Sequence, residues 1–295
     1  MLRPNDSSSG SAPATMNVRM FSNSARPGVG LKPRRESQRP LLPQHARHCP
    51  VLEAGSALGF LVYPPLEPFE SFYIGFYGEG RYQFVYYFQT EKGDWAPVFV
   101  VRIALPVGGL GTSMQEVEIK QPDVRMSRED ALLLMRKFVV PDDLGTPPGA
   151  VTLRGATNFR TPEGWDTVYT PVFNAIERPA PPMMVVRVET DWYMHETEFR
   201  YVLQPGEGIS GARTMPIGQV FFVPREDVTL QECTAEELDA MKRADEAFGR
   251  AKAAAQVTTP YGIPYSPHYL KESRSREKKQ LSGERSNMPA EGEHT

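Results

Sequence analysis

The densest group of side chains able to do chemistry lies in residues 189–201, which read ETDWYMHETEFRY. A non-haem iron site of the facial-triad type takes two histidines and one carboxylate on one side of the metal. His195, Glu198 and the distant His268 are the one set in the sequence that fits this requirement. If the chain is extended from residue 196 onward, however, His195 and Glu198 point to opposite faces and need a bulge to meet at one metal. The sequence therefore favours a surface or loop histidine, and it predicts no bound metal and no cofactor.

The carboxylates of the same segment allow two interpretations. Glu189 and Asp191 share one face of an extended chain, about 7 Å apart, which is a spacing open to an acid–base couple. The same two acids are equally placed to form ion pairs with Arg187 and Arg200 on adjacent strands. The ion-pair interpretation is favoured, because pairs of opposite charge stabilise neighbouring strands.

A polar residue in an apolar run and two tryptophans extend the set of candidates. Gln219 stands among apolar and glycine neighbours in PIGQVFFVPR (residues 216–225), and a buried amide needs hydrogen-bond partners. This amide either orients a ligand or satisfies loop backbone. The candidate ligand-binding residues are Trp165, Asp191, Trp192, His195, Glu198, Arg200 and Gln219.

Other catalytic motifs are missing from the sequence. It holds no G-x-S-x-G, P-loop or H-E-x-x-H string. Its two cysteines, Cys49 and Cys233, lack C-x-x-C spacing, which excludes a disulfide scaffold and a cysteine-rich zinc site and favours a reducing, cytoplasmic compartment. No catalytic residue is assigned, and whether the chain is an enzyme is left open.

Charge is distributed unevenly along the 295 residues. Residues 1–47 hold eight Arg and Lys against Asp6 and Glu36, a net +6, so the remainder carries −9 to reach the total of −3. An acidic body disfavours nucleic-acid binding, because phosphate neutralisation supplies most of the affinity in such complexes. No window approaches a run of about 18 apolar residues, so the sequence predicts no membrane span.

Both ends of the chain are predicted to be disordered. Residues 1–47 combine a serine-rich start, six prolines and clustered arginines with little to bury, and Met16 or Met20 would serve as initiator as well as Met1. Residues 271–295 alternate charges with Ser, Gly and Pro, as a solvated tail does.

The region 48–270 between these ends is predicted to be a single β-rich domain. The 28 prolines and 24 glycines of the chain argue against a helical bundle. In this region they separate runs of aromatic and β-branched residues that are typical of strands. The strand candidates are residues 82–88, 97–105, 150–154, 166–169, 183–189, 196–203 and 216–223. Capping residues and apolar spacing predict two helices, over about 127–139 and 235–256.

The order of motifs in the second half resembles an uncharacterised bacterial family, the domain of unknown function numbered 6065. The motifs are TPPG (146–149), FRTPEGW (159–165), ETDW (189–192), EFRY (198–201) and PIGQVFFVPR (216–225). The resemblance covers roughly residues 140–230. It implies a β-sandwich or jelly-roll-like fold, and it implies no activity.

Together these observations predict a mainly β protein, a two-sheet β-sandwich or jelly-roll-like domain with two peripheral helices. The leading hypothesis is a non-catalytic soluble protein that binds a small ligand or a protein partner, with oligomers possible. One alternative is a cupin-like metal-dependent oxygenase or isomerase that uses His195 and Glu198. A second alternative is an assembly subunit that docks through its basic N-terminal arm.

Overall fold

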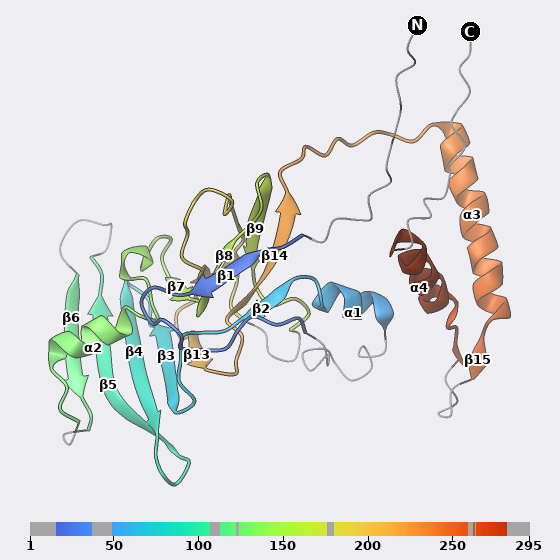
Figure 1. The fold of residues 1–295 in the computed structure, drawn as a ribbon. Helices are drawn as coiled ribbons and strands as arrows, with labels where there is room; N and C mark the ends of the chain where they lie inside the picture. The colour runs from blue at the N-terminus through green and yellow to red at the C-terminus, as the bar shows by residue number, and fades with distance from the viewer. Residues whose placement is uncertain are drawn as a thin grey trace, which may run out of the picture. The chain divides into compact units, whose positions relative to one another are not determined.

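The chain forms two units, each described by itself. The structure is a computed structural model and describes residues 16–36, 49–106, 113–121, 124–175, 180–258, 262 and 264–281. The β-rich unit spans Asn17–Glu226, and the other unit takes Asp227–Thr295 together with Met1–Met16 (Figure 1). This division differs from the predicted single domain of residues 48–270, because the β-rich unit begins earlier and ends before the second predicted helix.

The largest sheet of the β-rich unit has five antiparallel strands in the order β13-β3-β4-β5-β6. These strands are β3 (Glu70–Phe76), β4 (Arg81–Gln89), β5 (Trp95–Ala104), β6 (Met114–Ile119) and β13 (Gly208–Ala212). Side chains alternate between the two faces of a strand, and in β4 the residues Tyr82, Phe84 and Tyr86 share one buried face. The predicted strands at 82–88 and 97–105 are thereby confirmed.

Three smaller antiparallel sheets complete the unit, so the predicted mainly β, sandwich-like class is confirmed. Their orders are β11-β9-β14-β2, β10-β12-β7 and β1-β8. Their strands are β1 (Arg19–Ser22), β2 (Phe60–Val62), β7 (Ala150–Arg154), β8 (Thr157–Arg160), β9 (Trp165–Thr170), β10 (Met183–Met184), β11 (Val186–Val188), β12 (Glu198–Val202) and β14 (Gly218–Pro224).

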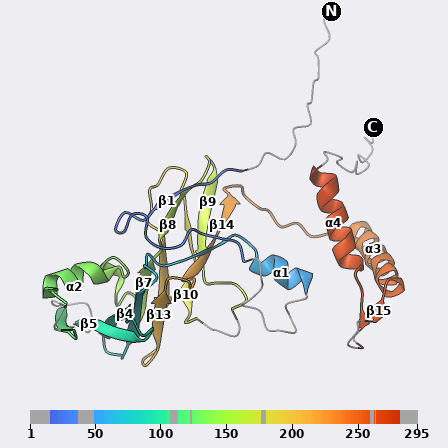
Figure 2. The ribbon, with the colours of Figure 1, turned by 60° about the horizontal axis from the view of Figure 1, so that its bottom comes forward.

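Aromatic rings fill the core on one face of the five-stranded sheet. Phe138, just after helix α2 (Arg128–Met135), stacks on Phe72 and Tyr86 with ring centroids 5.5 and 5.7 Å apart. The helix itself lies against β5 and β6 (Figures 1 and 2). One face of this sheet is therefore closed by packing.

The helices follow their capping signals. Ser127 caps α2 and Thr234 caps α3 (Ala235–Ala254), each through a capping box, so the predicted helix at 235–256 is confirmed and the one at 127–139 is shorter than predicted. The unit that begins at Asp227 also holds a short pair of strands and a further helix. These are β15 (Val257–Thr258), β16 (Pro264–Tyr265) and α4 (His268–Leu281), and the β-rich unit adds α1 (Pro50–Ser56) and the 3₁₀ turn η2 (Pro141–Asp143).

The predicted disorder of the two ends is wrong where the structure describes them. Within the predicted arm, β1 pairs with β8, and Arg34 bridges to Leu61. Within the predicted tail, residues 271–281 are helical in α4. Residues 1–15, 37–48 and 282–295 lie outside the described residues. Across the described part of the chain, no helix has the length and apolar character needed to cross a membrane.

Candidate functional site

The seven residues predicted to bind a ligand lie in four separate settings, and in one of these His195 lies against the rings of Tyr193 and Tyr169. Trp165, Asp191 and Trp192 lie around Arg225, at the end of β9 and β14. Glu198 and Arg200 lie on β12, next to β7. Gln219, on β14, faces the segment that follows α1. The structure therefore does not bring the seven candidate residues together in one site.

Asp191 is held by a network of charges. Its Oδ2 accepts a hydrogen bond of 2.9 Å from the Gly164 N–H, and its Oδ1 accepts one of 2.7 Å from Arg225. The hydrogen bond from Arg225 is the main reason that the pKa of Asp191 lies below its usual value. Asp191 therefore stays ionised at neutral pH as an ion-pair partner, which does not suit a general acid.

The same arginine also holds Asp166, whose side chain is 3% exposed. Burial opposes ionisation of Asp166, but hydrogen bonds from Arg225 and Arg187 outweigh it and lower the pKa of this carboxyl. Glu189 and Asp191 are ion-paired, but the partners expected from the sequence, Arg187 and Arg200, are wrong: both acids pair with Arg225. The sequence signal for this partner is Arg225 itself, the last residue of the PIGQVFFVPR motif.

Trp192 and His195 lie in the loop between β11 and β12. The Trp192 indole N–H donates a hydrogen bond of 2.7 Å to Glu189, and Trp192 is 66% exposed. His195 stacks on Tyr193 and meets the ring of Tyr169 edge-on, with centroids 5.7 and 5.9 Å apart. Burial lowers the pKa of His195, so the ring is neutral at pH 7. Among the described residues, no group of three or more His, Cys, Asp and Glu side chains could hold a metal ion.

Glu198 and Arg200 have partners on neighbouring strands and in η2. The Glu198 carboxylate lies 3.8 Å from Arg154 Nε, and Arg200 pairs with Asp143 and donates 3.1 Å to Thr152. Desolvation raises the pKa of Glu198, and the nearby Arg154 only partly offsets this. Glu198 is therefore a carboxylate that the fold destabilises in its charged form.

Replacing Glu198 by glutamine is expected to raise the free energy of unfolding at pH 7 by roughly 0.5–1 kcal/mol. A folded-state pKa above the unfolded one means that stability falls as pH rises between the two values. The glutamine variant does not lose stability in this way. Its free energy of unfolding should therefore exceed that of the wild type at pH 7 and match it below about pH 4. Urea unfolding from pH 3.5 to 8 measures this, with Glu116→Gln, at an exposed glutamate, as control. A variant less stable at pH 7 would contradict the prediction.

Gln219 satisfies backbone groups. Gln219 is 1% exposed. Its Oε1 accepts a hydrogen bond of 3.0 Å from the Phe173 N–H, and its Nε2 donates hydrogen bonds to the carbonyls of Ser56 and Leu58. Both N–H donors of the amide and its oxygen are bound to backbone groups, so this buried side chain is held by the loops around it. Of the two roles considered from the sequence, the structure supports backbone satisfaction.

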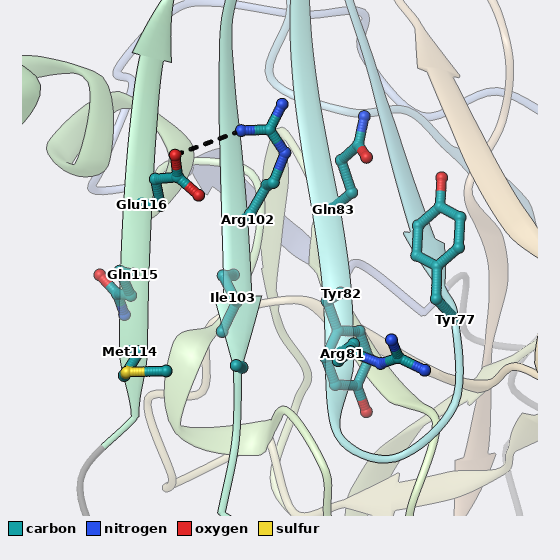
Figure 3. A pocket seen from close by; sticks show the side chains of 10 residues that line it. Tyr77, Arg81, Tyr82, Gln83, Arg102, Ile103, Met114, Gln115 and Glu116 are labelled. Carbon is teal, nitrogen blue, oxygen red and sulfur yellow. Dashed lines mark ion pairs between the residues drawn. The ribbon is translucent and has the colours of Figure 1, made fainter.

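A groove that the sequence did not indicate lies at one end of the five-stranded sheet. It encloses about 770 Å³, within the range of ligand sites. Figure 3 shows side chains of four adjacent segments along it. The lining residues are Tyr77, Arg81, Tyr82, Gln83, Arg102, Ile103, Ala104, Met114, Gln115 and Glu116.

Strand register explains how these residues meet. Gln83 on β4 pairs with Arg102 on β5, and Arg102 pairs with Glu116 on β6. Paired residues on adjacent strands share a face and lie about 5 Å apart, so the three side chains form one row across the sheet (Figure 3). On the other side of Gln83 the row continues through Gly75 of β3 and Gly208 of β13.

Ion pairs neutralise the charges of the groove. Arg102 lies 3.5 Å from Glu116 and donates 2.8 Å to Glu118. The hydrogen bond that Arg102 donates to Glu118 raises the pKa of Arg102, and the hydrogen bonds from Lys120 and Arg102 lower the pKa of Glu118. Both shifts favour the charged forms, so the row presents fixed donors and acceptors.

The sequence contains the signal for this groove only in part. Alternation within residues 82–88 and 97–105 places Gln83 and Arg102 opposite the buried aromatics, but no local pattern shows which strands pair or in which register. Comparison with known proteins adds no family: no protein-family model matches the chain, and the search of curated proteins found no relative. The chemistry of the groove therefore stands as the basis for a functional hypothesis.

Proposed function

We propose that this protein is a non-catalytic binding protein whose ligand occupies the groove across β4, β5 and β6. The observation that carries this proposal is the open row of Gln83, Arg102 and Glu116, fixed by strand pairing and flanked by the exposed ring of Tyr77. A few placed polar groups beside an aromatic surface are typical of ligand sites. Side chains held on rigid strands also lose little freedom on binding.

The electrostatics of the groove support binding over catalysis. A general acid or base works best with a pKa near the working pH. In the row, the pKa of Arg102 is raised and that of its partner Glu118 is lowered, which moves both away from neutrality. The resemblance to family 6065 brings no activity to this proposal and stays a prediction.

The proposal is tested by blocking the groove. The probes are a mixed panel of neutral oligosaccharides, acidic sugars, nucleotides, amino acids and short peptides, observed by saturation-transfer NMR. Ala104, which lines the groove and pairs with Arg81 and Met114, is changed to tryptophan to fill it. We expect at least one probe class to give signals with the wild type that the Ala104→Trp variant loses.

The matched control places the same tryptophan elsewhere. Lys92, exposed in the turn between β4 and β5, is changed to tryptophan, and this variant should keep the signals. Circular dichroism and thermal unfolding confirm that both variants fold. If no probe binds, or if Ala104→Trp and Lys92→Trp behave alike, the proposed function is wrong.

A further inference from the structure

We infer that the ligand of the groove is a neutral carbohydrate, laid across the strands on a tyrosine platform beside the polar row. This inference rests on the proposed function and names its ligand class. Three features of the sheet face support this inference. The Tyr73 ring lies over two glycines, and the charges of the row are balanced. The backbone N–H and C=O groups of β4 and β5 are already used in strand pairing.

The platform begins with Tyr73, whose ring lies along the sheet. A β-carbon built on Gly208 would lie 2.2 Å from the Tyr73 hydroxyl, and one built on Gly75 would lie 2.7 Å from it. The phenol end therefore occupies the space where two side chains would otherwise stand. Gly75 pairs with Gln83, so the Tyr73 ring ends beside the first polar side chain of the row.

Two further tyrosines extend this surface. Tyr77 lines the groove and is 48% exposed. Tyr73 and Tyr77 lie an even number of residues apart at the end of β3, and Tyr87, opposite Ser71, lies on the same face of β4. Burial raises the pKa of Tyr73 and of Tyr87, so both are uncharged at neutral pH. Aromatic rings of this kind offer an apolar face with a polar edge, which matches the apolar C–H face and the hydroxyl rim of a sugar ring.

The balance of charge selects a neutral ligand. Arg102 is paired with Glu116 and Glu118, and Arg81 lies 3.1 Å from Glu79. Nucleic acids and other polyanions need uncompensated positive charge, which these arginines do not supply. The amide of Gln83, the guanidinium of Arg102 and the carboxylate of Glu116 instead offer adjacent donors and acceptors, suited to vicinal hydroxyl groups.

The sheet face also disfavours a peptide strand. Extended peptides dock on sheet edges, where unpaired backbone N–H and C=O groups are free. In the groove, β4 lies between β3 and β5, and β5 lies between β4 and β6, so their backbone groups are used in the ladder. Over β4 and β5 only side chains can contact a ligand, whereas β6 is the edge strand of the sheet, and the valine-rich peptide in the test below probes that edge.

The test titrates the wild type with neutral oligosaccharides of four to six units built from glucose, mannose, galactose or N-acetylglucosamine. Isothermal titration calorimetry measures each affinity. Oligogalacturonate, a single-stranded oligonucleotide and a valine-rich peptide are the comparison probes. We expect at least one neutral oligosaccharide to bind, and Tyr77→Ala to weaken it roughly tenfold or more.

Two control variants separate stacking from general damage. Tyr77→Phe keeps the ring and should stay close to the wild-type affinity. Tyr193→Ala removes a tyrosine of similar exposure, 50%, in another loop, and it should leave binding unchanged. Neutral-sugar binding that Tyr77→Ala leaves intact overturns the inference.

The outcomes also distinguish this inference from the proposed function. If only the comparison probes bind, and Ala104→Trp abolishes their binding, the groove is a binding site and the carbohydrate inference is wrong. If no probe binds in a way that Ala104→Trp abolishes, both are wrong.

Discussion

Replacing Glu70 by alanine is expected to lower the free energy of unfolding by about 3–5 kcal/mol. This carboxylate is 5% exposed and is bound by Arg26 through both terminal nitrogens, by the Glu67 N–H at 2.8 Å and by the Tyr86 hydroxyl at 2.5 Å. Truncation leaves the buried guanidinium and hydroxyl without their acceptor, and an unpaired buried charge is far more costly than a lost surface pair. Urea unfolding at pH 7 measures the effect.

Two comparisons test the cause of this loss. The double variant Arg26→Met/Glu70→Leu removes both charges and should be clearly more stable than Glu70→Ala, because no orphan charge remains. Burial opposes ionisation of Glu70, but hydrogen bonds from Arg26, Glu67 and Tyr86 lower its pKa below the usual value. The wild-type advantage over Glu70→Ala should therefore be present above about pH 4.5 and shrink as pH falls through the folded-state pKa. An advantage that stays constant with pH would contradict the ionic explanation.

Replacing Gly149 by alanine should be nearly as damaging, with a loss of about 3–4 kcal/mol. Gly149 ends the TPPG motif with φ at +83°, and a β-carbon there would lie 2.1 Å from the Leu203 carbonyl oxygen. The Gly149 carbonyl accepts a hydrogen bond of 2.9 Å from the Leu203 N–H. The backbone at Gly149 therefore cannot move away from that at Leu203 without breaking this hydrogen bond. Thermal and urea unfolding measure the loss.

Gly93 offers a matched control for the backbone term. It has φ at +88°, and nothing lies within 4 Å of a β-carbon built there. Gly93→Ala should therefore cost only the strain of the left-handed conformation, about 1 kcal/mol. Equal losses in the two variants would show that the close approach to Leu203 is unimportant.

Patterns among neighbouring residues predicted the helices and strands that neighbouring residues stabilise. The capping residues Ser127 and Thr234 marked the starts of α2 and α3, because a cap and its partner lie three residues apart. Alternating aromatics marked β4, because a strand with one buried face has a period of two. The partner of Asp191 was not local: Arg225 lies 34 residues further along the chain, outside the dense run of charges.

What the sequence missed depends on contacts between distant segments. The arginine-rich start of the chain has a disordered composition, but Arg26 is buried against Glu70, and Asn23 donates 2.8 Å to the Gly155 carbonyl. Amino-acid composition does not show which residues far apart in the sequence become partners in the fold. The groove was missed for the same reason, since Gln83, Arg102 and Glu116 belong to three strands and are joined only by their register.

The pairing of β1 with β8 has a consequence for synthesis on the ribosome. Residues 19–22 are made before their partners at 157–160, which follow roughly 7–30 s later at the usual rates of translation. Throughout that interval β1 has no ladder to join, and Asn23 lacks the Gly155 carbonyl that it binds in the finished fold. β1 is thus the earliest strand of the β-rich unit to emerge, and it cannot join its ladder until residue 160 has been made.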